Sequence, residues 1–323
     1  YQGSRTTRSC SSPPRSSSSQ RQRAFSSPLL SSNFQTALDE ISNSVRVRGN
    51  EQVLLLNGQQ SYPVRYRLIQ QAKKSIIMST FSIYSGNDNG EIADPFSRKM
   101  VELLIEKKQQ GVEVLVIYDG GTSVLAKSQT AIDQLRAHHI KVIKYNPIVT
   151  DQTDVHLLLS IIPGALKFAF NQHPINNRWH EKTMIVDGEY MISGGLNWGA
   201  PYALGNAFSK QIPNYYQSFY SHPLIQELRL RDHDSWHRTS DTGWRDTDVL
   251  IKGPLATQAA RRLLIDFSLI EYLQNHRGAD FEDATIDDVA QSYNLYMQRY
   301  QSKEDDYFNT TYLQNERRDM VKP

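Results

Sequence analysis

From Val53 onward the hydrophobic positions fall into two alternating patterns. Apolar runs of strand length occur at 53–56, 75–84, 112–118 and 140–145, and apolar positions at helical spacing occur at 62–74, 95–110 and 131–138. Asp94-Pro95 is typical of a helix start, and Gly111 of a helix end. Strands that alternate with helices across short loops predict an α/β fold, with a mixed, mostly parallel sheet flanked by helices.

A strand–turn–strand unit follows at 183–193. Its two apolar runs are separated by Asp187-Gly188, a pair that favours a tight hairpin turn. Because strand side chains alternate between faces, His180 and Lys182 are expected to project from the same face. Gly194 and Gly195 allow a close backbone approach, which brings Asn197 back toward the same point.

These residues suit a phosphate-sized anion. An imidazole can act as a nucleophile or as an acid–base group near neutral pH. A lysine ammonium and an amide N–H can stabilise charge that develops on phosphoryl oxygens. His180, Lys182 and Asn197 therefore form a candidate phosphoryl-transfer site.

His180, Lys182 and Asp187 stand as H-x-K-x4-D, and G-G-x-N begins at Gly194. This arrangement resembles the phospholipase D superfamily, and among its branches the cardiolipin synthase and phosphatidyltransferase proteins; the resemblance covers 53–197. It implies a phospholipase D-like lobe that acts on phospholipid head groups through a phosphohistidine intermediate, without a metal or cofactor. It makes His180 the nucleophile and Lys182 and Asn197 phosphate ligands. It also implies that Asp187 holds the hairpin and the lysine, and that Gly194, Gly195 and Trp198 lie beside the substrate.

The segment Trp244–Pro254 extends the resemblance. It reads WRDTDVLIKGP and is similar to the family pattern W-R-D-x-x-[VL]-x-[IL]-x-G-P, a strand that leads into a helix, here 257–273. The resemblance implies that Asp246 orients the nucleophilic histidine. Many synthases carry His at the second position after this acid, whereas this chain has Asp248.

No second H-x-K occurs after His180, although the chemistry implied by the resemblance uses two histidines. We expect either that a C-terminal lobe supplies the second motif, or that two chains pair their motifs in a homodimer, or that the site is inactive. Spacing in two-motif family members favours the first, and Tyr1 in place of a starting Met indicates a processed or partial chain. The expected domains are a disordered tail at 1–35, a catalytic lobe at 45–243 and a bridge or partial second lobe with a helical tail at 244–323.

Composition narrows the function classes. The net charge of +2 in 323 residues gives little support to the alternative of a single-motif nuclease acting on nucleic acid. A single cysteine, Cys10, excludes a disulfide framework and a Cys-based zinc site. The Ser/Arg-rich start predicts disorder or a targeting remnant.

Two further stretches leave alternatives open. The apolar insert at 155–170 is read as a core-covering hairpin or as a flap that meets lipid. The aromatic stretch at 198–236 is read as a substrate mouth or as a packed loop. The expected partners are a phospholipid and a membrane surface, with peripheral membrane association. A catalytically incomplete lipid-binding module is the non-enzymatic alternative.

Overall fold

The computed structural model describes residues 31–42, 47–85, 91–121, 128–145, 178–205, 219–230, 243–277 and 284–309. The chain divides into two compact units, Tyr1–Arg46 and Val47–Pro323. In the first unit the structure describes helix α1 (Ser32–Ser42), which overlaps the end of the predicted tail. The insert at 155–170 and residues 310–323 of the predicted helical tail lie outside the described residues, as does most of the aromatic stretch.

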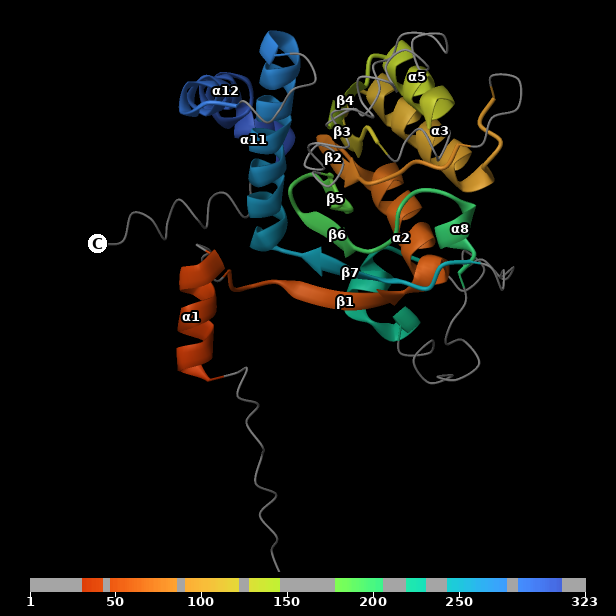
Figure 1. Cartoon of the computed structure of the whole chain (residues 1–323). Coiled ribbons are helices and arrows are strands. Elements are labelled where there is room, and N and C mark those ends of the chain that lie inside the picture. Colours follow the sequence, from red (N-terminus) through yellow and green to blue (C-terminus); the bar gives the residue numbers. More distant parts are fainter. Residues whose placement is uncertain are drawn as a thin grey trace, which may run out of the picture. The chain divides into compact units, whose positions relative to one another are not determined.

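One seven-stranded sheet forms the centre of the described part of the second unit, in the order β1-β7-β6-β5-β2-β3-β4 (Figure 1). The strands are β1 Glu51–Leu56, β2 Ser75–Thr80, β3 Glu113–Asp119, β4 Lys141–Tyr145, β5 Thr183–Val186, β6 Tyr190–Gly194 and β7 Thr247–Lys252. The mixed α/β fold is as predicted, but parallel pairing is confined to β2, β3 and β4. The other four pairings are antiparallel, because β5 and β6 form a hairpin and β7 returns between β6 and β1.

Helices cover both faces of this sheet. The principal ones are α2 Asn57–Gln71, α3 Pro95–Gln109, α5 Gln129–Ala137, α11 Pro254–Arg277 and α12 Ile286–Arg299; shorter ones are α8 Ala200–Ala203, α10 Pro223–Glu227, η3 Gln301–Lys303 and α13 Glu304–Tyr307. In β2, Ile76 and Met78 enter the core that α2, α3 and α5 cover, whereas Ile77 enters the core under α11. Figure 1 shows α11 on one side of the sheet and α2, α3 and α5 on the other.

Local signals in the sequence explain several element ends. The Asp94 side chain accepts hydrogen bonds from the backbone N–H groups of Phe96 and Ser97, which caps α3 as predicted. Gly111 follows that helix with φ 88°, the left-handed conformation of a typical helix end. Helix α2 begins at Asn57, earlier than predicted, and contains Pro63.

The segment after Trp244 belongs to the same sheet as the H-x-K hairpin. Its strand β7 pairs with β6 on one side and β1 on the other, and α11 then packs across that sheet. The predicted boundary at 243/244 therefore does not separate two compact units. Strand β7 and helix α11 thus belong to the compact unit Val47–Pro323.

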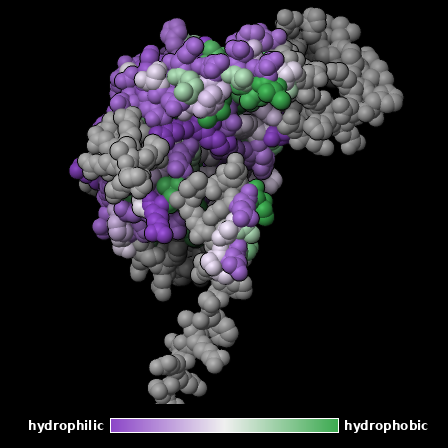
Figure 2. All heavy atoms as spheres, turned by 90° about the vertical axis from the view of Figure 1, so that its left-hand side faces the viewer, coloured by the Kyte–Doolittle hydropathy of each residue, from purple (hydrophilic) through white to green (hydrophobic). Residues whose placement is uncertain are grey.

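The face shown in Figure 2 is mainly hydrophilic among its coloured residues, with hydrophobic side chains gathered in its upper part. Helix α12 leaves Ile286, Val289, Tyr293 and Met297 exposed. Within the described ranges, none of the helices has both the length and the apolar composition needed to cross a membrane.

Candidate active site

Most of the predicted site residues, all except Asp187 and Trp198, lie at one edge of the sheet. The ends of β2, β3 and β6 lie there beside the starts of β5 and β7, because β5 and β7 run antiparallel to their neighbours. His180 and Lys182 precede β5, Gly194 and Gly195 lie at the end of β6, and Asp246 precedes β7. The topology therefore brings together residues that are more than 60 positions apart in the sequence.

His180 and Lys182 share one aromatic neighbour, Phe81, which follows β2. The His180 ring is exposed and packs edge to face on Phe81, with a centroid distance of 4.6 Å and an interplanar angle of 65°. The Lys182 side chain is buried; its Nζ lies 4.9 Å from the centre of the Phe81 ring and donates a 2.7 Å hydrogen bond to the carbonyl oxygen of His180. The imidazole and the ammonium thus lie on the same side of the strand, as its period predicts.

Both groups have lowered pKa values. Burial, with a smaller contribution from the Lys182 charge, holds the pKa of His180 below its ordinary value, while Asp119 and Asp246 oppose this shift. Burial lowers the pKa of Lys182 to about 8, although Asp246, Asp119 and Asp248 attract the charged form. At neutral pH the imidazole is therefore mostly unprotonated, as a nucleophile requires, and the lysine still carries its charge.

Asp246 lies against the glycine pair. A Cβ atom added to Gly195 would be 2.1 Å from the Asp246 carboxylate oxygens, and one added to Gly194 would be 2.4 Å from the carbonyl oxygen of Thr247. Only glycine allows this approach, so the close passage predicted from the sequence is present. One carboxylate oxygen of Asp246 accepts from the Thr247 N–H at 2.8 Å, and Asn57 accepts from the Asp246 N–H at 3.3 Å.

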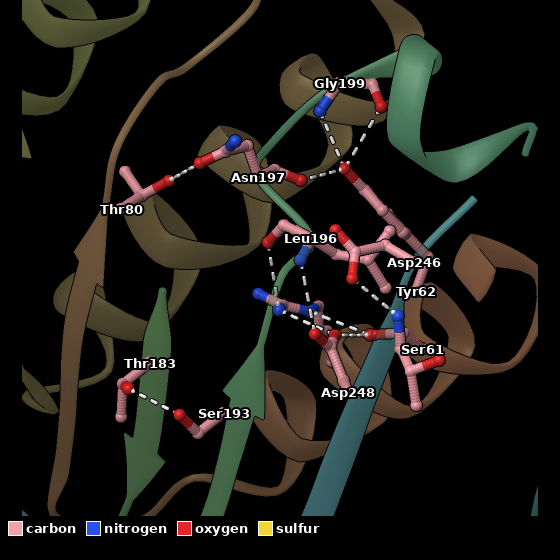
Figure 3. A network of polar contacts seen from close by, with 12 residues as sticks. Ser61, Tyr62, Thr80, Thr183, Ser193, Leu196, Asn197, Gly199, Asp246 and Asp248 are labelled. Carbon is pink, nitrogen blue, oxygen red and sulfur yellow. Dashed lines mark hydrogen bonds and ion pairs between the residues drawn. The ribbon is translucent and has the colours of Figure 1, made fainter. Parts of the chain in front are cut away.

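Asn197 is buried, and its polar groups form hydrogen bonds within the protein (Figure 3). Its Oδ1 accepts from the backbone N–H groups of Phe81 and Ser82, both at 3.2 Å, and its Nδ2 donates to the Tyr202 hydroxyl at 2.7 Å. Tyr62 donates to the carbonyl oxygen of Asn197 at 2.8 Å. The predicted phosphate ligand is thus held by the protein through both atoms of its amide.

Asp187 lies at the opposite end of β5 from Lys182. Its carboxylate accepts from the backbone N–H groups of Lys73, Lys74 and Ser75 at 2.7–3.2 Å, which fixes the turn to the start of β2. Both Asp187 and Gly188 have positive φ, 54° and 62°, as a tight Asp-Gly turn needs. These hydrogen bonds of Asp187 hold the hairpin, as predicted, and do not involve the side chain of Lys182.

Trp198 does not lie at the surface of the site. Its side chain is 1% exposed and belongs to the core under α2, and its backbone pairs with Ile83 and Tyr84. The pairing turns this large ring inward. Its predicted place beside the substrate is therefore corrected to a place in the core.

The sequence reasoning missed Asp119, a fully buried acid at the end of β3. Its carboxylate accepts from the backbone N–H groups of Trp179 and Gly121, each at 2.9 Å, and pairs with Arg178 at 3.4 Å. It thereby anchors the two residues before His180. An acid followed by two glycines at the end of a buried strand was the available signal.

A second missed feature is the buried ion pair between Arg65 of α2 and Asp248 of β7, at 2.9 Å. Asp248 also accepts from the Ser61 hydroxyl and from the Leu196 N–H, while Arg65 donates to the carbonyl oxygen of Leu196 at 3.3 Å (Figure 3). The pair therefore holds the G-G-x-N loop. Among the described residues no group of three or more His, Cys, Asp or Glu side chains could hold a metal ion.

The segment that carries most of this site is similar to a phospholipase D-like domain. Residues 66–207 match the family model described as cardiolipin synthase, PLD-like domain. Cardiolipin synthase A of Pseudomonas syringae pv. syringae is 28% identical over 51% of this chain and 29% of its own length. Cardiolipin synthase 1 of Bacillus cereus is 31% identical over 50% of this chain and 26% of its own length.

A solved structure, the phospholipase D family member Nuc from Salmonella typhimurium, is 14% identical with a TM-score of 0.36, covering 67% of this chain and 92% of Nuc. The matches span less than a third of each of the two synthases. The family model therefore assigns residues 66–207 to the phospholipase D-like domains of the cardiolipin synthase branch, which is the branch that the motifs resemble.

Proposed function

We propose that this chain is a phospholipase D-like enzyme that hydrolyses or transfers phosphodiesters of phospholipid head groups through a phosphohistidine at His180. The observation that carries the proposal is that the His180 imidazole and the Lys182 ammonium lie at one edge of the sheet in contact with the same Phe81 ring. The motif-bearing domain and its synthase relatives favour a phospholipid over other phosphodiesters.

The reaction has two balanced steps. In the first, the free electron pair of the imidazole of His180 attacks phosphorus, a P–N bond forms, and the P–O bond to the leaving alcohol breaks. The alcohol oxygen takes a proton from an acid. In the second, water or another alcohol attacks phosphorus, the P–O bond re-forms, and the P–N bond breaks, with the attacking oxygen's proton passing to a base.

The residues of this chain would divide these tasks. Lys182 and the amide of Asn197 would neutralise charge on the phosphoryl oxygens, and Asp246 would orient the imidazole. A second histidine, from a C-terminal lobe or a partner copy, would act as the acid. Peripheral contact with the membrane surface would present the head group.

The first step can be tested without the second histidine. A p-nitrophenyl phosphodiester releases a phenolate that needs no proton, so the chain alone should give a burst of nitrophenol. Rapid quenching at alkaline pH followed by peptide mass spectrometry should find the phosphoryl group on His180, and His180→Ala should abolish both signals.

His139 supplies a matched control, because it also stands in an H-x-K spacing, with Lys141, but lies at the opposite end of β4 from the site and is exposed. His139→Ala should keep the full burst. A burst that survives in His180→Ala, or a label on another residue, would contradict the proposal. Phosphatidylglycerol vesicles and single-stranded DNA, compared as substrates with a second motif present, would then separate a lipid enzyme from a nuclease.

A further inference from the structure

Phe81 contacts both the imidazole and the ammonium of the site, although the sequence analysis did not include it. The residue directly follows β2, and its ring contacts the His180 imidazole at 4.6 Å and the Lys182 ammonium at 4.9 Å, measured from the ring centre. Both groups of the proposed reaction therefore share one aromatic surface.

Hydrogen bonds from its backbone and that of Ser82 hold Phe81 in place. The buried Asn197 amide oxygen accepts from the N–H groups of Phe81 and of Ser82. Asn197 is in turn held by the hydroxyl groups of Tyr62 and Tyr202. The turn that carries Phe81 is thus attached to the core by the last residue of the G-G-x-N motif.

An aromatic ring at this point acts on its two neighbours in different ways. Its negative face attracts the ammonium of Lys182 by a cation–π interaction. Its contact with His180 has the edge-to-face arrangement that aromatic rings prefer. The apolar ring also covers part of both groups, and loss of contact with water is the largest cause of both lowered pKa values.

The charged groups around Lys182 explain why such a restraint is needed. Asp119 of β3, Asp248 of β7 and Asp246 before β7 all attract its ammonium. Without the ring, a flexible lysine side chain would be drawn toward these carboxylates and away from the place where a phosphate would bind. Asp119 and Asp246 also act on His180.

We propose that Phe81 is a positioning residue that holds the His180 imidazole and the Lys182 ammonium at a fixed separation and shields both from water. The inference rests on the function proposed above and deepens it. It also gives Asn197 a second task, because the same amide that is the predicted phosphate ligand holds the Phe81 turn.

The test uses the full chain and four substitutions. Phe81→Leu and Phe81→Met remove the ring, and the methionine keeps most of the volume if the leucine variant does not fold. Phe81→Tyr and Phe81→Trp keep an aromatic face. Phe308→Leu is the control, because Phe308 is a fully buried ring that packs on Gly188, at the other end of the hairpin.

The primary measurement is an NMR titration without substrate. His180 and Lys182 signals are assigned by their loss in His180→Gln and Lys182→Met. In Phe81→Leu and Phe81→Met both pKa values should rise toward the ordinary ones, because water reaches both groups; in Phe81→Tyr and Phe308→Leu they should stay. The nitrophenol burst should slow about 10- to 100-fold without the ring, the scale of loss that a misplacement of about 1 Å produces.

Unchanged titrations in both ring-removing variants would overturn the proposal. So would equal shifts in Phe308→Leu, which would indicate a general loosening. Because the titrations need no turnover, they decide the role of Phe81 even if the wild-type chain forms no phosphohistidine. That last result would instead overturn the proposed function.

Discussion

The buried ion pair Arg65–Asp248 and the buried Lys182 lie at the same edge of the sheet but differ in how their charges are compensated. Asp248 and Arg65 are almost fully buried, paired at 2.9 Å, and bonded to Ser61 and to both backbone polar groups of Leu196. Lys182 is also buried, yet its hydrogen-bond acceptor is a neutral carbonyl oxygen, that of His180.

The difference in hydrogen-bond partners distinguishes charged residues that stabilise the structure of the site from a charged residue that would take part in the reaction. A buried charge is tolerated when its partner and its hydrogen bonds replace water. A buried charge without that compensation has a shifted pKa instead, and perturbed pKa values gather at functional sites. The Arg65–Asp248 pair fixes the G-G-x-N loop, whereas the lowered pKa of Lys182 leaves an ammonium that gains from an incoming phosphate.

Breaking the buried pair should have the largest effect. Asp248→Ala leaves the Arg65 guanidinium buried without a counter-charge, so the free energy of unfolding should fall by about 3–5 kcal/mol. Urea denaturation measures the loss. Lys108→Ala is the control, since it removes a partly exposed pair with Glu113 that should contribute at most about 1 kcal/mol. Equal losses in the two variants would mean that burial of the pair does not matter.

Lys182→Met should have the next largest effect, and its sign differs between activity and stability. The burst should fall about 10²- to 10³-fold, as when an oxyanion donor is removed. Stability should not fall, because the folded state disfavours the charged form. As pH rises from about 8 through the ordinary lysine pKa, Lys182 holds more protons in the unfolded chain than in the folded one, so the contribution of Lys182 to the free energy of unfolding should rise with pH.

The variant lacks that contribution, so the difference in stability between wild type and variant should shift in favour of the wild type over the same pH range. Urea denaturation of both proteins at several pH values measures the difference. A constant difference across the range would contradict the low pKa of Lys182.

The local part of this site could be predicted from the sequence. Period-two alternation placed His180 and Lys182 on one face, and Asp-Gly marked the turn that the structure contains. These features depend on neighbours a few positions away. The glycine pair was likewise interpretable, because glycine is the residue that permits a very close approach.

The remainder depends on which strands are neighbours. Arg65 and Asp248 are 183 positions apart and meet only because β7 returns between β1 and β6. Apolar runs of similar length give no direction, so apart from the hairpin at 183–193 the antiparallel pairings that reach this edge were not predicted. Phe81 looked like any core residue of an apolar strand, and Trp198 looked like a site residue only because it follows Asn197.

The smallest expected effect is on the pKa of His180, and it distinguishes the roles of the two acids that act on its imidazole, Asp119 and Asp246. Both Asp119 and Asp246 raise the pKa of its imidazole, so replacing either by Asn should lower that pKa further. Asp119→Asn should also reduce stability, because its carboxylate anchors Arg178 and Trp179. Asp246→Asn should leave stability nearly unchanged and slow the burst if this acid orients the nucleophile.

The pH dependence of the burst measures this effect alongside the NMR titration of His180. The unprotonated imidazole is the nucleophile, so the burst falls as pH drops through its pKa, and a lower pKa moves that fall to lower pH. An Asp246→Asn variant with an unmoved titration would assign the orienting role to Asp119. The acid at the end of the buried strand β3 would then do what family resemblance assigns to the W-R-D segment.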